Sequence, residues 1–177
     1  MPESPDNPAG PFQLVTQYDA TLRKKLIEGI RQTPVALRNV VSGLSDTQLD
    51  TKYRNWTIRQ ITHHVADSHL HSLVRFKWAL TEDHPTIKAY EEADWVETTD
   101  CRSGDIKPTL QMLDGLHAKW VQVLESMTDS QYSRTFLHPQ SGETVNLWTA
   151  LNYYPWHGRH HTAQIQWLCD QHNWQES

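Results

Sequence analysis

The segment Trp156–Ile165 holds three histidines within five residues, at positions 157, 160 and 161. His157 and His161 stand four residues apart, which on an α-helix places them about 40° apart around the axis and about 6 Å apart along it. Two imidazoles in this relation can bind one metal ion from consecutive turns of the helix. The pair therefore predicts part of a metal site. His160 is offset to the other side of His157 and is expected at the surface or beside a ligand.

A second group of histidines, at positions 63, 64, 69 and 71, can supply the third ligand. We expect His64 in this role, and the other three compete with it. His71 shares a helix face with His64 but lies about 10 Å further along the axis, so one ion cannot easily take both. Three neutral imidazoles leave coordination positions open, as in catalytic zinc sites, where bound water loses a proton near neutral pH.

Asp67 lies one helical turn after His64 and is the candidate catalytic residue, either as a proton acceptor or as a group that orients a ligand imidazole. Gln164, one turn after His160 and His161, is a similar candidate for orienting a ligand. Each of these residues also has an ordinary interpretation, as a solvated helix side chain or as a histidine of a polar core. The remaining histidines are isolated in sequence and are expected at the surface: His84, His117, His138 and His172.

The composition narrows the class of protein. The chain has 177 residues, which suits one domain with a sizeable core, and a formal net charge of −5. No block of lysine or arginine stands out, so nucleic acid is not expected as a partner. A secretory signal and an apolar run of membrane-spanning length are both missing, and the two cysteines form no CxxC pair. We therefore expect a cytoplasmic protein that does not associate with membranes.

Two long helices are expected in the first half of the chain. Apolar residues recur at helical spacing over residues 15–41, and Pro34 within this run predicts a kink or a break into two helices. A capping box at residues 57–60 opens the helix that carries His64. This helix is expected to cover residues 58–81.

Two further long helices and a hairpin are expected in the second half. A third amphipathic helix is predicted over residues 108–127, and the last over residues 146–171, with Pro155 expected to bend it. Two β-rich runs, at 132–136 and 143–146, flank a turn that contains proline and glycine. They predict a small β-hairpin just before the last helix.

The remaining segments complete the predicted fold. Residues 82–100 show no helical period and hold seven acidic side chains, so we expect a long loop, either a solvated crossover or a lid. Residues 1–12 hold four prolines and predict an extended arm outside the single domain of residues 13–177. The sum is an all-α fold, for which a four-helix bundle is the natural arrangement. The long link allows an up-down-down-up order without forcing it.

Three motifs connect these residues to a known family. They are Trp56-Thr57-x-Arg59-Gln60-x-x-x-His64-x-Ala66-Asp67-Ser68, Arg75-Phe76-Lys77-x-Ala79-Leu80-Thr81-Glu82-Asp83 and Trp156-His157-Gly158-x-His160-His161-x-Ala163. Together they resemble the YfiT branch of the DinB/YfiT-like superfamily. The resemblance implies an up-down-down-up four-helix bundle that holds zinc or nickel on three histidines, which map onto His64, His157 and His161.

The resemblance also implies an activity. The branch is described as metal-dependent hydrolases, and related members are S-transferases that use bacillithiol or another low-molecular-weight thiol, which the metal would hold as a thiolate. Many relatives are homodimers, so a homodimer is expected for this chain, and DNA binding is not. Our leading hypothesis is an enzyme with one divalent ion per chain, Zn²⁺ or Ni²⁺, and a small-molecule substrate. It is either a metal-dependent hydrolase or a thiol S-transferase, and the alternative is a non-catalytic helical module that binds a metal or ligand.

Overall fold

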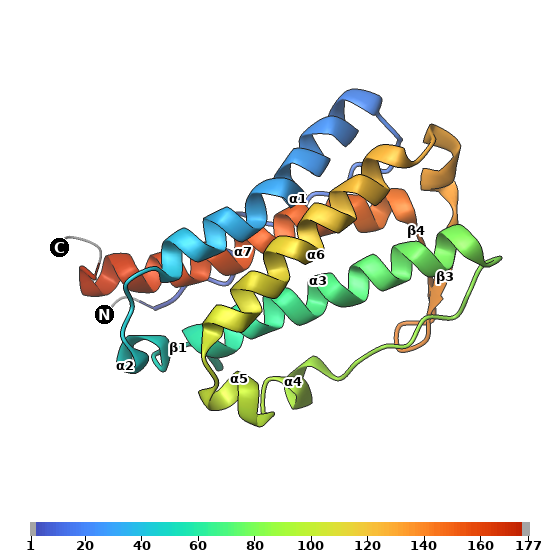
Figure 1. Ribbon diagram of the computed structural model, residues 1–177. Helices are drawn as coiled ribbons and strands as arrows, with labels where there is room; N and C mark the ends of the chain where they lie inside the picture. The colour runs from blue at the N-terminus through green and yellow to red at the C-terminus, as the bar shows by residue number, and fades with distance from the viewer. Residues whose placement is uncertain (1–2, 175–177) are drawn as a thin grey trace.

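Four long helices form a bundle in the computed structural model, which describes residues 3–174 of the chain (Figure 1). They are α1 (Ala20–Val41), α3 (Ile58–Thr81), α6 (Ile106–Ser126) and α7 (Leu147–His172). α1 and α3 each lie beside both α6 and α7. Figure 1 shows α1 and α7 running in one direction and α3 and α6 in the opposite one. The expected all-α bundle with up-down-down-up order is therefore confirmed.

Side-chain caps determine where the long helices begin. Asp19, Thr57, Asp105 and Asn146 each accept a hydrogen bond from a backbone N–H in the first turn. Thr57 also forms the predicted capping box with Gln60. The caps explain two differences from the predicted boundaries. α1 begins at residue 20 instead of 15, and α6 begins at residue 106 instead of 108.

The two helix-internal prolines do not divide their helices. α1 continues through Pro34 and α7 through Pro155, so the predicted break at Pro34 is absent. Both prolines lie where α1 and α7 pack closely. A Cβ added to Gly29 would lie 2.9 Å from Cβ of Pro155, and one added to Gly158 would lie 2.6 Å from Cγ2 of Thr33. Packing between the two helices therefore holds each proline inside a continuous helix.

Two small antiparallel hairpins flank the bundle. The predicted hairpin before α7 is formed by β3 (Thr135–His138) and β4 (Glu143–Asn146). A second hairpin, β1 (Lys52–Tyr53) with β2 (Trp56–Thr57), was not predicted. Its strands have two residues each, which is too short for an alternating pattern to show. This hairpin leads directly into α3 and so fixes the position of Trp56.

The link from α3 to α6 runs along the outside of the bundle (Figure 1). The sequence predicts a loop here, but the structure contains α4 (Glu92–Trp95) and α5 (Thr99–Ser103). Helices of four and five residues are too short to show a helical period, which is why the sequence does not reveal them. The other short elements are α2 (Asp46–Leu49) and the 3-10 helix η1 (Asp129–Ser133).

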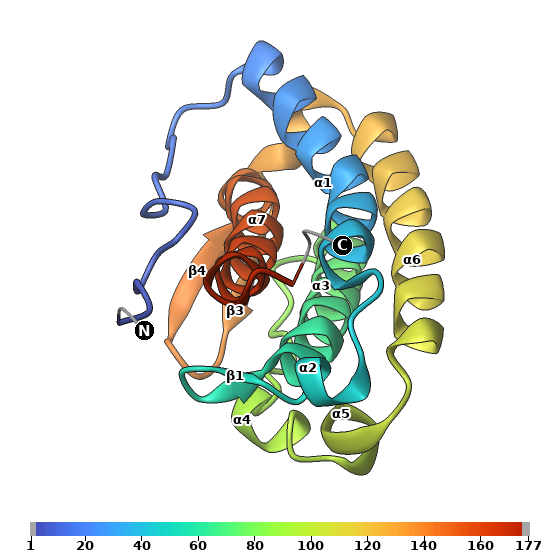
Figure 2. The same cartoon turned by 90° about the vertical axis from the view of Figure 1, so that its left-hand side faces the viewer.

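The chain before α1 lies alongside α7, as Figure 2 shows. The indole N–H of Trp156 donates to the Gly10 carbonyl at 2.9 Å, and that of Trp148 donates to the Val15 carbonyl at 2.7 Å. The first two residues of the predicted arm lie outside the described part of the chain. None of the helices in the described part combines the length and apolar character that a membrane span needs.

Candidate metal centre

His64 of α3 and His157 and His161 of α7 converge on one point inside the bundle, and we call them the histidine triad. All three are buried, and their ligand nitrogens lie within 4.8 Å of one another. The Nε2 atoms of His64 and His157 are 3.3 Å apart. Nitrogens bound at 2.0–2.1 Å to a tetrahedral zinc ion lie about 3.3 Å apart. The triad therefore has the spacing that one such ion requires.

A chain of hydrogen bonds, the histidine relay, determines which nitrogen of His157 carries the proton. Nδ1 of His117 donates to the Ile30 carbonyl at 2.6 Å. Nε2 of His117 lies 2.9 Å from Nδ1 of His69, and Nε2 of His69 lies 3.0 Å from Nδ1 of His157. A carbonyl can only accept, so each neutral imidazole in turn must carry its proton on Nδ1. The lone pair on Nε2 of His157 is therefore free for a metal ion.

The acceptor at the start of the relay is available because of Pro34. In an α-helix the carbonyl of Ile30 normally accepts from the N–H of the residue four positions later, and proline has no N–H. A buried carbonyl without a donor is unfavourable, and His117 supplies the donor. The proline in α1 therefore helps to orient a histidine in α7.

A second, shorter network orients His161. Its Nδ1 lies 2.8 Å from Oε1 of Gln164, and Nε2 of Gln164 lies 2.9 Å from Nε2 of His160. The amide nitrogen can only donate, so the amide oxygen accepts from Nδ1 of His161. This leaves Nε2 of His161 free for a metal ion. His160 lies one turn before Gln164 on α7 and accepts a hydrogen bond from its amide nitrogen. The His160 ring also stacks on the Trp156 ring, with the ring centroids 4.9 Å apart.

The triad is uncharged at neutral pH. Burial lowers the pKa of His64 to about 4. Burial, and then the charge of neighbouring histidines, holds the pKa values of His157 and His161 well below their usual range. Neutral imidazoles present lone pairs, and zinc, nickel, copper and iron(II) all accept such ligands. The donor set therefore fits a divalent ion and does not choose among these metals.

Two cavities border the triad, each at a different histidine. One of about 190 Å³ is lined by His161, Gln164 and Trp56. The other, of about 450 Å³, is lined by His157 together with residues of α3, of the link, and of the β3–β4 hairpin. The Trp56 ring lies 4.7 Å from His64, so an aromatic wall covers part of the site. Each cavity therefore borders one member of the triad.

Asp67, the candidate catalytic residue, faces α5. Its Oδ2 lies 4.0 Å from Sγ of Cys101, and burial and then the charge of Asp100 raise its pKa to about 6. Within residues 3–174, the structure shows no hydrogen bond from Asp67 to the triad, and Asp67 lines neither cavity. His63, Asp100 and Cys101 form a second group whose ligand atoms lie within 4.8 Å of one another.

Two other candidates for the third ligand position, His63 and His71, contact groups outside the triad. His63 contacts Thr109 at 2.8 Å, and His71 stacks on Tyr90 at 4.2 Å. The expectation that His117 lies at the surface is wrong, since it is only 2% exposed and belongs to the relay. Its signal was its register on α6, four residues after Leu113 and three before Trp120, both fully buried. That register places His117 on the core face of the helix.

Comparison with known proteins identifies the family. The sequence pattern described as the DinB superfamily matches residues 30–165. The chain belongs to the DinB superfamily. It is 44% identical over 169 residues to a Geobacillus thermodenitrificans protein named "putative metal-dependent hydrolase", with 94% of this chain and 95% of that protein covered. The YfiT protein of Bacillus subtilis, which carries the same description, is 38% identical over 169 residues, with 94% and 95% covered.

A solved structure shows the same fold in this DinB relative. The structure of YfiT from Bacillus subtilis matches with a TM-score of 0.92 and covers 95% of this chain and 97% of that one, at 38% identity. It is described as a probable metal-dependent hydrolase with an unusual four-helix bundle topology. The expected relation to the YfiT branch of the DinB/YfiT-like superfamily is therefore confirmed. The names of these relatives and the buried histidine triad both indicate a metal ion.

Proposed function

We propose that this DinB-superfamily protein is a metal-dependent hydrolase in which His64, His157 and His161 bind one divalent ion, Zn²⁺ or Ni²⁺. The observation that supports this most strongly is the arrangement of the triad. Three neutral imidazoles meet at the spacing of metal ligands, and separate hydrogen-bond networks orient His157 and His161. Three protein ligands leave a position open, as catalytic sites require.

A divalent ion bound there would supply Lewis acidity, which lowers the pKa of a water or thiol that it binds. The chain's own residues hold this site ready. The relay keeps the proton of His157 on Nδ1, and Gln164 does the same for His161. Asp67 has a pKa of about 6 and is ionised at neutral pH, but its carboxylate faces α5 and it lines neither cavity, so it is not placed to take a proton at the triad. In hydrolysis, water would add across the scissile bond, with its hydroxyl going to the electrophilic atom and its proton to the leaving group.

Transfer of a low-molecular-weight thiol is the second candidate reaction, and the presence of two cavities at the triad favours it. A reaction between a thiol and an electrophile needs room for two substrates, and the cavities beside His157 and His161 provide it. The thiol sulfur would bond to the electrophilic carbon, the leaving group would depart with the bonding electrons, and the thiol proton would pass to the leaving group or to solvent.

Metal analysis and a paired assay test this proposal. Protein purified without a histidine tag is expected to contain close to one divalent ion per chain and to lose it in His161→Ala. Loaded protein is then given activated esters and amides, and separately an alkylating electrophile, each with and without a small thiol. Turnover without thiol supports hydrolysis, and consumption of thiol in step with the electrophile supports transfer. Full metal content or an unchanged rate in His161→Ala would contradict the proposal.

A further inference from the structure

Arg75 is a cation in the wall of the 450 Å³ cavity that reaches His157. Its Nη1 donates to the Tyr154 hydroxyl at 3.3 Å, and its Nε is buried without a hydrogen-bond partner. Over residues 3–174, no carboxylate lies within ion-pair distance of Arg75. A partly buried guanidinium without an anion is unfavourable, because lost hydration is not replaced by a charge partner.

The other arginines in the described part of the chain show how unusual this is. Six form ion pairs with carboxylates: Arg23, Arg31, Arg38, Arg54, Arg59 and Arg102. Arg134 donates to the backbone carbonyls of Ala79 and Glu82, and Arg159 is exposed to water. Arg75 differs from all of these, since it has neither a carboxylate, nor a set of backbone acceptors, nor full exposure.

A second polar group without a partner lies in the same cavity wall. His138 of the β3–β4 hairpin lines the cavity, and its Nδ1 is buried without a hydrogen-bond partner. Arg75 and His138 line this cavity together, and both also line a cavity of about 310 Å³ beside it. Two neighbouring polar groups without partners in a cavity wall indicate a ligand that accepts hydrogen bonds. A guanidinium selects carboxylate or phosphate oxygens, which it can bind through two parallel hydrogen bonds.

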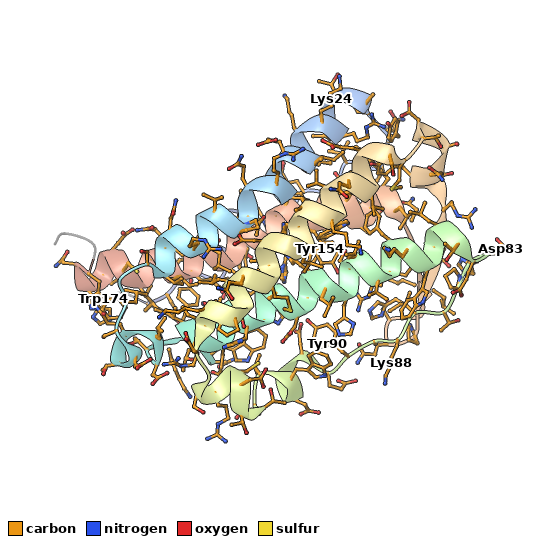
Figure 3. All side chains as sticks on the ribbon, in the orientation of Figure 1. Lys24, Asp83, Lys88, Tyr90, Tyr154 and Trp174 are labelled. Carbon is orange, nitrogen blue, oxygen red and sulfur yellow. The ribbon has the colours of Figure 1, made fainter. Side chains whose placement is uncertain are left out.

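The rest of the cavity limits the charge and shape of that ligand. The Tyr153 and Tyr154 rings lie 5.6 Å and 6.0 Å from the His157 ring, so tyrosines line the path from Arg75 to the triad. Figure 3 shows Tyr154 among the helices and Tyr90 on the link beside α3. Glu91 and Glu92 also line the cavity, and their repulsion of an anion grows with the charge of that anion. This favours a singly charged carboxylate over a phosphate dianion.

We propose that Arg75 binds a single carboxylate of the substrate, and that the substrate is therefore a small organic acid whose reacting group lies at the histidine triad. This inference rests on the proposed function for the position of the reacting group. The carboxylate site itself depends only on Arg75, His138 and the cavity that they share. The two claims can therefore fail separately.

Thiols that bind both ends of the cavity test the proposal directly. Protein loaded with Co²⁺ is titrated with ω-mercaptoalkanoates of increasing chain length and with the ω-mercaptoalkanols of the same lengths. The sulfur-to-cobalt charge-transfer band reports binding at the triad. At the chain length that spans the cavity, the carboxylate compound is expected to bind roughly tenfold more tightly than the alcohol. Arg75→Met should reduce this ratio to about one and leave the dissociation constants of the alcohols unchanged.

Lys77→Met is the matched control, because it removes an exposed positive charge two residues away on the same helix. It should keep the preference for the carboxylate. Equal binding of acid and alcohol at every chain length, or a preference that survives in Arg75→Met, would overturn the proposal. A variant whose only defect is lower thermal stability would also overturn it, since that result assigns Arg75 a purely structural role with Tyr154.

A second measurement separates this proposal from the metal site. Metal-free protein labelled with ¹⁵N is titrated with hexanoate and with hexanol, and the Arg75 Nε–H resonance is identified by its absence in Arg75→Met. Hexanoate should shift this resonance and hexanol should not. A shift without any cobalt–thiolate band would support the carboxylate site and contradict the proposed metal function. Equal responses to hexanoate and hexanol would overturn the carboxylate site whatever the metal does.

Discussion

His63 and His64 are neighbours on α3, but they face two different polar groups. His64 meets His157 and His161 between α3 and α7, where every member is a neutral, buried imidazole. His63 faces Thr109 and lies in a group with Asp100 and Cys101, where Asp100 is exposed. In both groups the candidate ligand atoms lie within 4.8 Å of one another. Proximity of suitable residue types therefore does not distinguish the two groups.

Orientation and charge do distinguish them. In the triad, acceptors outside the site place the protons of His157 and His161 on Nδ1, so the free nitrogens face the common point. In the second group the one carboxylate, Asp100, is exposed and carries a negative charge, which adds to burial in raising the pKa of the neighbouring Asp67. Groups behind the candidate ligands, and not proximity alone, therefore prepare the triad for a metal ion.

Removal of one triad ligand should have the largest effect. His161→Ala is expected to lower the affinity for Zn²⁺ by roughly 100-fold or more, because two imidazoles remain and Gln164 loses its partner. His63→Ala should keep the wild-type affinity. Competition with a chromophoric chelator measures both constants. An equal loss in the two variants would remove the distinction between the two groups.

The relay should have the next largest effect, although His117 does not touch the metal position. His117→Phe is expected to weaken Zn²⁺ binding roughly 10- to 100-fold, because His69 and His157 lose the acceptor that orders their protons. His117→Gln, which can both donate and accept, should recover part of the affinity. ¹⁵N spectra of the metal-free protein should show His157 protonated on Nδ1. Protonation on Nε2 would contradict the relay.

The buried histidines of the triad and the relay should give a pH dependence of stability opposite to that of Asp67 in the metal-free protein. Burial lowers the pKa values of His64 and His117 from 6.5 to about 4, so the unfolded chain binds more protons between these values. Their contribution to stability is present above pH 6.5 and is lost as the pH falls toward 4. The pKa of Asp67 is raised from 3.8 to about 6, so its contribution is present below 3.8 and is lost as the pH rises through 6.

Asp67→Asn should therefore stabilise the metal-free protein at pH 7. After allowance for solvent screening, the free energy of unfolding is expected to rise by about 1–2 kcal/mol, and the gain should vanish near pH 4. Urea unfolding across this pH range measures the difference. His117→Phe should reduce the loss of stability that the wild-type protein shows as the pH falls from 6.5 toward 4. A constant difference between Asp67→Asn and wild type at all pH values would contradict the assignment of the slope to Asp67.

Pro34→Ala should have the smallest effect. The new N–H at position 34 can bond to the Ile30 carbonyl and compete with His117, but the carbonyl has a second lone pair. We expect a loss of Zn²⁺ affinity of roughly two- to fivefold, with no loss of helix content. Val35→Ala is the control, since Val35 is 52% exposed. Equal affinities for the two variants would show that the proline does not influence the relay.

Helical spacing predicts well the features that depend on residues close together in the sequence. The pair His157 and His161 lies on one helix, so four-residue spacing is enough to place both imidazoles on one face. The capping box at Thr57 likewise depends on neighbours in sequence, and α3 begins where it predicts. The fold class follows because four amphipathic segments leave few alternatives to a bundle.

Contacts between distant segments are what the sequence does not reveal. The relay joins α1, α6, α3 and α7, and His117 has no neighbour in sequence that suggests its partners. Pro34 carried a usable signal, because a helix-internal proline always frees the carbonyl four residues earlier. The missing partners of Arg75 are a property of the cavity, and no spacing along the chain can show them.

An anomalous-scattering map from crystals soaked in Zn²⁺ would show whether the triad binds a metal ion. We expect one strong peak about 2.0–2.1 Å from Nε2 of His64, His157 and His161, with a further position filled by a non-protein ligand. A peak at His63, Asp100 and Cys101 with none at the triad, or no peak at the triad while its rings stay in place, would contradict it.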